Sequence, residues 1–208
     1  MPRAALGIRA HSGWGALIAV TYEHGDITIL DRRRIPITGT KDAGASQPYH
    51  AARILQLPEA ETFIANAFEA AHTTAASALR EVKDVLSAQK FHIAGCAILM
   101  AAGRTLPPLE KILAAHPLLH TAEGVFFREA FAKGCESNAI SVTKIKERDL
   151  EVKLKESLGR DETRSRKKVQ LLGRTIGSPW TADQKNATLA ALVLLSAVKK
   201  RSERNKSR

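Results

Sequence analysis

The sequence predicts an α/β fold in which a mixed five-stranded sheet carries helices on both faces. Three alternating apolar segments begin the chain and are separated only by short glycine-containing turns, which is typical of an antiparallel meander. Two later apolar segments are each preceded by a helical pattern, so both are reached by crossover connections. The resulting order is β-β-β-α-β-α-β-α with further helices, which indicates one sheet covered on both sides.

The meander occupies the first part of the chain. We expect strands over about residues 4–11, 15–23 and 26–36. The turns between them contain Gly13 and Gly25, and glycine readily adopts the positive φ that tight hairpin turns require.

A long amphipathic helix and a buried strand come next, after a loop over residues 38–56. Pro58 lies in the first turn of the helix, where a missing N–H group is tolerated. Apolar residues then recur at steps of three and four as far as Leu86, as expected for a helix packed on a core. The apolar run 91–103 ends in glycine and predicts a central strand, with 91–99 beside the first strand.

Two shorter helices separate this strand from the fifth. Pro107 and Pro108 precede a short helix that Pro117 ends, and the helix after it closes near Gly134. Proline is unfavourable inside a helix and favourable at its start, so these positions mark boundaries. The alternating segment 139–146 predicts the fifth strand, nearer the edge of the sheet.

The chain ends in helices. A basic helix is expected over 161–176. Thr181 and Gln184 form a capping box for a final helix that runs to about Lys200. The apolar run 187–198 within it predicts a buried helix, and it is shorter than the ~20 residues that span a bilayer. We therefore expect no membrane segment.

The net charge of +11 is concentrated in two stretches of the 208 residues. Residues 160–174 contain six basic and two acidic residues, and residues 199–208 contain six basic and one acidic. We expect a single domain over 1–198 followed by a basic disordered tail. A local basic surplus is typical of proteins that bind nucleic acid, although the tail alone is equally explained as a solubilising segment. The predicted phosphate-binding residues are Arg164, Arg166, Lys167, Lys168, Lys199, Lys200 and Arg201.

The two cysteines, Cys96 and Cys135, have no metal-ligand spacing and no disulfide framework, which fits a reducing cytoplasm. Arg9 and His11 interrupt the apolar stretch at the N-terminus, so no signal peptide is expected.

The order of elements and several short motifs resemble the ribonuclease H-like superfamily, and within it the bacterial Holliday-junction resolvases. Their first strand typically reads LGIDPG, followed by GYG or GWG before the second. Here residues 6–9 read LGIR and residues 13–15 read GWG. The last helix of that branch carries a D-x-x-D-A-L-A-like pattern, and residues 183–190 read DQKNATLA. The resemblance covers most of residues 4–198.

The resemblance implies a nuclease whose carboxylates hold two divalent ions, Mg²⁺ or Mn²⁺. In this sequence the first-strand aspartate is replaced by Arg9, the fourth-strand acid falls in the LMAA of residues 99–102, and the last-helix motif ends in Asn186. Only Asp183 remains. One carboxylate and one amide cannot hold two metals, so we expect a catalytically degenerate protein that binds nucleic acid through phosphates without sequence specificity. Such a protein needs no cofactor, and Mg²⁺ or Mn²⁺ stays open for the alternative of a metal-dependent nuclease.

Other polar residues are candidates for a replacement site. His120 and Glu123 lie three residues apart on one helix and share a face, and Asp183 and Lys185 lie at the N-terminus of the last helix, where the dipole favours anions. Together these four are the candidate catalytic residues, and Arg9, His11, His50 and Asn186 are the candidate ligand-binding residues. A cluster of His11, His50, His120, Glu123 and Asp183 can hold one metal ion, or an anion together with Arg9 and Lys185. Taken singly, each is explained more simply as a capping or solvated side chain.

Three functional classes therefore stay open. The first is a non-catalytic nucleic-acid-binding protein, which the charge favours. The second is a metal-dependent nuclease with relocated ligands, against which the missing carboxylates count. The third is a scaffolding protein that forms a homodimer through the apolar faces of helices 59–89 or 118–134, since a fold by itself does not decide function.

Overall fold

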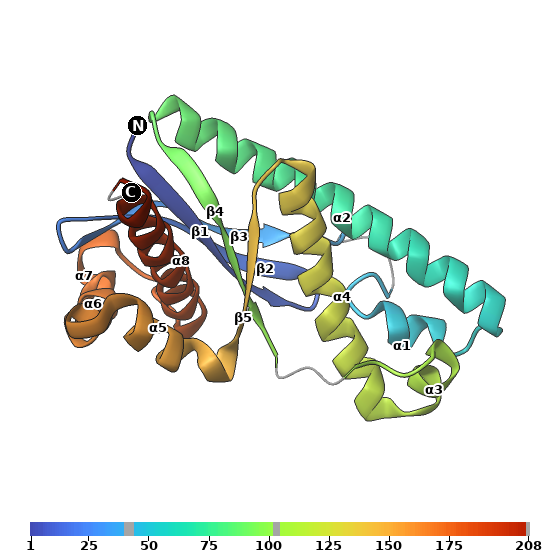
Figure 1. Ribbon diagram of the computed structural model, residues 1–208. Helices are drawn as coiled ribbons and strands as arrows, with labels where there is room; N and C mark the ends of the chain where they lie inside the picture. Colours follow the sequence, from blue (N-terminus) through green and yellow to red (C-terminus); the bar gives the residue numbers. More distant parts are fainter. Residues whose placement is uncertain (40–43, 102–104, 207–208) are drawn as a thin grey trace.

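The computed structural model describes residues 1–39, 44–101 and 105–206 and contains the expected mixed five-stranded sheet (Figure 1). The strand order is β3-β2-β1-β4-β5, with antiparallel pairing across the meander and parallel pairing of β1 with β4 and of β4 with β5. The predicted meander and central strand are thus confirmed. The strands are β1 (Arg3–His11), β2 (Trp14–Glu23), β3 (Asp26–Pro36), β4 (His92–Met100) and β5 (Val142–Lys146).

Helices cover both faces of this sheet, as Figure 1 shows. On one face lie α2 and α4; on the other lies α8, with α5 and α6 packed against it. The helices are α1 (Pro48–Ala52), α2 (Leu57–Ala88), α3 (Leu109–Ala114), α4 (His116–Ser137), α5 (Leu150–Leu158), α6 (Glu162–Leu171), α7 (Gly173–Ile176) and α8 (Ala182–Lys206), with 3₁₀ turns at Glu147–Asp149 and Gly159–Asp161.

The strand β1 divides the core into two layers because its side chains alternate between the faces. Leu6 and Ile8 pack with α2 and α4 in one layer, and Ala5 packs with α8 in the other. The face of β1 that carries its even-numbered residues is therefore apolar along its length. On the α8 face, Ala5 and Gly7 are followed by the polar residues Arg9 and His11 at the end of the strand.

Three expectations about helices were wrong. The segment 38–56, expected as a loop, contains the short helix α1. The basic helix expected over 161–176 is divided into α6 and α7. The last helix does not end near Lys200 but continues to Lys206, so the residues expected as a disordered tail are mostly helical. The strong helix-forming tendency of the lysines and arginines in this stretch is consistent with that extension.

The apolar faces that we considered for a homodimer are used inside the chain. On α2, the predicted stripe from Ala71 to Leu86 packs in the same buried cluster as Phe127 and Phe131 of α4. Cys96 and Cys135 are also buried in that cluster, and burial raises the pKa of the Cys96 thiol. Among the described helices, none is long and apolar enough to cross a membrane.

Candidate functional site

A polar cluster lies where the parallel strands end. The carboxyl ends of β1, β4 and β5 meet at one edge of the sheet, because parallel neighbours run in the same direction. Arg9 of β1 lies opposite Leu99 of β4. Glu147 follows the last residue of β5 directly. These positions bring a basic and an acidic side chain from distant parts of the chain to the same edge.

The helix α8 adds a second carboxylate to this cluster. It packs across β1 at Gly7, where a side chain on the strand would overlap the backbone of Ala187. Asp183 lies one helical turn before Ala187 and therefore reaches Arg9, two residues beyond Gly7 on the same face of the strand. The pairing of Arg9 with Asp183 follows from this close approach.

The guanidinium of Arg9 bridges the two carboxylates. Its Nε donates to Glu147 Oε1 at 3.2 Å and its Nη2 donates to Oε2 at 3.0 Å, a two-pronged contact, while Nη1 donates to Asp183 Oδ1. The hydrogen bonds that Arg9 donates to Glu147 are the main cause of a raised pKa of Arg9; burial acts against them, and Asp183 adds to the rise. Planar bidentate pairing of this kind is the strongest form of the arginine–carboxylate contact.

A row of rings and a second cation extend the cluster. The Nε2 of His11 lies 3.0 Å from Asp183 Oδ2, and the His11 ring stacks on Trp14 with centroids 4.3 Å apart and planes at 11°. The guanidinium carbon of Arg34 lies 4.0 Å from the Trp14 ring centroid, as in a cation–π contact. Trp14, which precedes β2's apolar run, is therefore part of this polar edge.

Arg128 of α4 brings a further guanidinium near Arg9 and Glu147. Burial lowers the pKa of Arg128; the charge of Glu147 opposes this change, and the charge of Arg9 adds to it. Its Nε is buried and has no hydrogen-bond partner within the part of the chain that the structure describes. Arg9, Arg34 and Arg128 therefore lie at this edge together with the two carboxylates.

The residues at this edge do not fit a pair of divalent ions. Glu147 and Asp183 are both paired with Arg9, which stands between them. In the parallel neighbour, Leu99 and Met100 offer no oxygen ligand from their side chains. Asn186 lines a small cavity beside Glu147, and Lys185 forms no ion pair with a described residue. Hard ions such as Mg²⁺ need several oxygen ligands free of competing cations.

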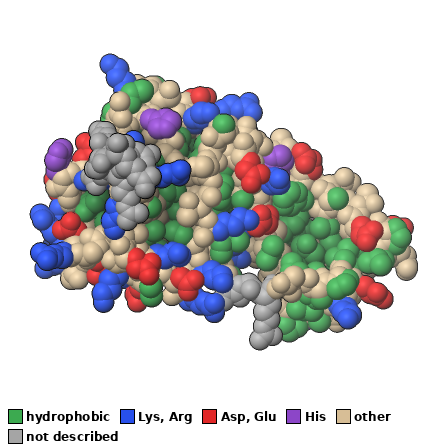
Figure 2. Space-filling model, in the orientation of Figure 1, with side chains coloured by type: hydrophobic (Ala, Val, Ile, Leu, Met, Phe, Trp, Pro, Cys, Tyr) green, Lys and Arg blue, Asp and Glu red, His purple; other side chains and the backbone are tan. Residues whose placement is uncertain are grey.

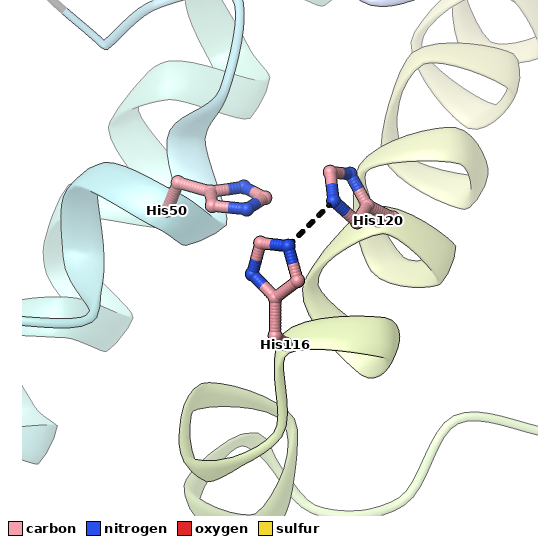
Figure 3. Close-up of side chains that lie close together, drawn as sticks. All are labelled: His50, His116 and His120. Atoms are coloured by element: carbon pink, nitrogen blue, oxygen red, sulfur yellow. Dashed lines mark hydrogen bonds between the residues drawn. The ribbon is translucent and has the colours of Figure 1, made fainter.

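A second group lies at the N-terminal end of α4. The side chains of His50 from α1 and of His116 and His120 from α4 face one another (Figure 3). Their nearest ring nitrogens, one from each residue, all lie within 4.8 Å of one another. Glu123, one turn further along α4, accepts a hydrogen bond from His50 Nδ1 at 2.7 Å and is 2% exposed.

The candidate residues thus fall into two groups rather than one cluster. Arg9, His11 and Asp183 share the strand edge, while His50, His120 and Glu123 lie at α1 and α4. Within the described residues, no hydrogen bond, ion pair or ring contact joins the two groups.

His116 and Glu147 are among the residues of these groups that were missed from the sequence. His116 lies four residues before His120, and this i, i+4 spacing was a visible signal, because such residues share a helix face. Glu147 carried no signal of its own. It is one acid in the charged stretch after β5, and only the parallel pairing of β5 with β4 brings it to Arg9.

The predicted phosphate-binding residues are partly engaged within the molecule. Arg166 pairs with Glu162 and Glu151, and Lys168 pairs with Asp26. The Lys200 ammonium donates to the carbonyl of Glu156, although the residue is exposed. In the described part of the chain, four of the seven are exposed and have neither an ion pair nor a hydrogen bond to another residue, namely Arg164, Lys167, Lys199 and Arg201.

Comparison with solved structures shows the ribonuclease H-like fold of the Holliday-junction resolvases. The structure of Thermus thermophilus RuvC in complex with Holliday junction substrate matches with a TM-score of 0.51 and 12% identity, over 96% of this chain and 97% of that one. A second Thermus thermophilus RuvC structure gives 0.49 at 12% identity, over 95% and 96%. The yeast mitochondrial resolvase Ydc2 gives 0.45 at 12% identity, over 97% and 81%. No family model and no curated protein matches the sequence.

Proposed function

We propose that this protein binds nucleic acid through phosphate contacts and lacks two-metal nuclease activity. The observation that carries the proposal is the bridge from Arg9 to Glu147 and Asp183. The resolvase-like fold supports nucleic acid as the ligand, since the neighbour with the same fold is bound to a Holliday junction.

The bridge counts against catalysis because Arg9 is a permanent cation. A divalent ion entering between Glu147 and Asp183 has to displace a guanidinium that already holds both. At about 4 Å, a single extra unit charge is repelled by about 4 kcal/mol at the effective dielectric of a protein surface. The nearby Arg128 adds to this repulsion. The positive charges of Arg9 and Arg128 therefore take the place that metal ions occupy beside the carboxylates of a nuclease.

The binding surface in this proposal comprises the four cations of α6 and α8 that have no partner among the described residues. Arg164 and Lys167 are three residues apart on α6 and lie on one side of that helix. Lys199 and Arg201 lie in the last turns of α8, and α6 packs on α8. Lys and Arg side chains gather over the α6 side of the molecule in Figure 2. A surface of exposed cations without exposed aromatic rings suits phosphates better than bases.

A salt titration on a labelled duplex tests the binding. The Arg164→Ala/Lys167→Ala variant should bind more weakly and with a log–log salt slope shallower by about 1.8, at about 0.9 per phosphate contact. The matched control is Lys133→Ala/Lys144→Ala, which loses the same charge from cations paired with Glu136 and Glu129. It should leave the slope unchanged. Equal slopes for both variants would contradict the proposed surface.

The absence of nuclease activity is tested separately. The protein should not cleave branched or duplex DNA or RNA in Mg²⁺ or Mn²⁺. Metal-dependent cleavage that Asp183→Ala abolishes would instead support a nuclease with relocated ligands. No binding at ~50 mM salt, where electrostatic binding is strong, would favour the scaffolding alternative, and sedimentation would then report whether the chain dimerises.

A further inference from the structure

We propose that His50, His116 and His120 bind one Zn²⁺ ion, with Glu123 as the carboxylate that orients His50. This site is independent of the nucleic-acid surface and of the Arg9 cluster.

The three imidazoles already converge. His116 and His120 lie one turn apart on α4, and their Nε2 atoms are 3.1 Å apart. The His50 ring centroid is 5.1 Å from that of His116 and 4.7 Å from that of His120. In a tetrahedral zinc site with Zn–N bonds of ~2.0–2.1 Å, neighbouring nitrogens are separated by ~3.3 Å. Small side-chain rotations therefore suffice to bring the three nitrogens to a common ion (Figure 3).

Glu123 prepares His50 for this role. Its Oε1 accepts from the Nδ1 of His50 at 2.7 Å and from the His50 backbone N–H at 3.3 Å. With the proton on Nδ1, the lone pair of His50 lies on Nε2, which is the nitrogen left to bind a metal. Histidine ligands of zinc usually donate their other N–H group to a carboxylate in this way.

The negative charge of the buried Glu123 also favours a bound cation nearby. The carboxylate is 2% exposed, and no Lys or Arg of the described chain pairs with it. A buried carboxylate without a matching charge is costly. A divalent ion on His50 would supply the missing positive charge one residue away.

Three imidazoles select the class of metal. Neutral imidazole binds Zn²⁺ and other late divalent ions, whereas Mg²⁺ and Ca²⁺ prefer oxygen ligands. His116 and His120 are exposed and His50 is half-buried, so a fourth position is open to water or to an external ligand. The ion would fasten α1, and with it the segment before α2, to the first turns of α4.

Zinc binding to the untagged full chain, measured by competition with a chromophoric chelator, tests the site. The wild-type protein should bind one equivalent of Zn²⁺, excess Mg²⁺ should not displace it, and Zn²⁺ should raise the thermal unfolding midpoint. The His116→Ala/His120→Ala variant should no longer bind this equivalent of Zn²⁺. Both residues are exposed on α4, so this variant should keep the wild-type circular dichroism spectrum. His92→Ala, at an exposed histidine of β4, is the matched control and should bind zinc normally.

Glu123→Gln should bind zinc about 10–100-fold more weakly, the usual loss when a carboxylate behind a histidine ligand is neutralised. The proposal is overturned if the wild-type chain binds no zinc, or if the double variant binds it as tightly as wild type. It is also overturned if His92→Ala loses the same equivalent. None of these outcomes depends on nucleic-acid binding or on nuclease activity.

Discussion

Gly7 of β1 lies against the backbone of Ala187 in α8, so closely that a Cβ on Gly7 would overlap the Ala187 carbonyl oxygen. This contact fixes how closely α8 packs on the sheet. It brings Asp183, one turn earlier, to the side chain of Arg9. The glycine of the LGIR motif thus determines where the candidate site forms.

Gly7→Ala should therefore destabilise the protein by roughly 3 kcal/mol, the upper part of the usual range for overpacking, because the obstacle is backbone and cannot rotate away. Urea unfolding measures the loss. The matched control is Gly124→Ala in α4, where the nearest atom is the flexible end of Arg128. It should be neutral, or stabilising by up to about 1 kcal/mol from helix propensity. Equal stability of Gly7→Ala and wild type would refute the close approach.

Arg9→Ala should leave two partly exposed carboxylates, Glu147 without its bidentate partner and Asp183 with His11 as its remaining contact. We expect a loss of about 1–3 kcal/mol, below that of a fully buried pair. Added Mg²⁺ or Ca²⁺ should then raise the unfolding midpoint of this variant more than that of wild type, because the two carboxylates are freed. Arg33→Ala, which breaks a pair with Asp31 on β3, is the control and should cost less than about 1 kcal/mol. An Arg9→Ala variant with wild-type stability and no response to divalent ions would contradict the bridging role.

Removal of residues 199–208 should weaken nucleic-acid binding without unfolding the chain. Six cations leave, so the salt slope should become shallower, by at most about 0.9 for each cation that contacts a phosphate. The thermal midpoint should change little, because the continuously buried part of α8 ends at Ser196. An unchanged slope would assign the C-terminal segment to solubility, and a large fall in the midpoint would show that the end of α8 stabilises the fold.

The meander, the central strand and the long helix could be predicted because each depends on local patterns. Gly13 and Gly25 have positive φ in the two turns, as expected. The alternating apolar residues of β1 and the apolar stripe of α2 correctly predicted the buried face of each element. Helix boundaries in the basic segments were predicted less well. Propensity alone does not separate a helical end of α8 from a disordered one when few apolar residues mark the boundary.

The candidate site was only half visible in the sequence. The absence of the resolvase carboxylates was plain from Arg9, residues 99–102 and Asn186. What stands in their place was not, because Arg9 meets Glu147 across 138 positions and Asp183 across 174. Likewise, Lys168 was counted among the free cations before its contact with Asp26 was known.

By itself, the sequence determined the five strands and the long helix, the apolar faces of these elements and the metal ligands that are missing. These properties follow from the period of the side chains and from the chemistry of single residues. Tertiary structure alone decided which charges cancel and which histidines meet. Such contacts depend on the parallel order of β1, β4 and β5 and on the packing of α1 against α4, because side chains far apart in the chain interact only where the fold brings their elements together.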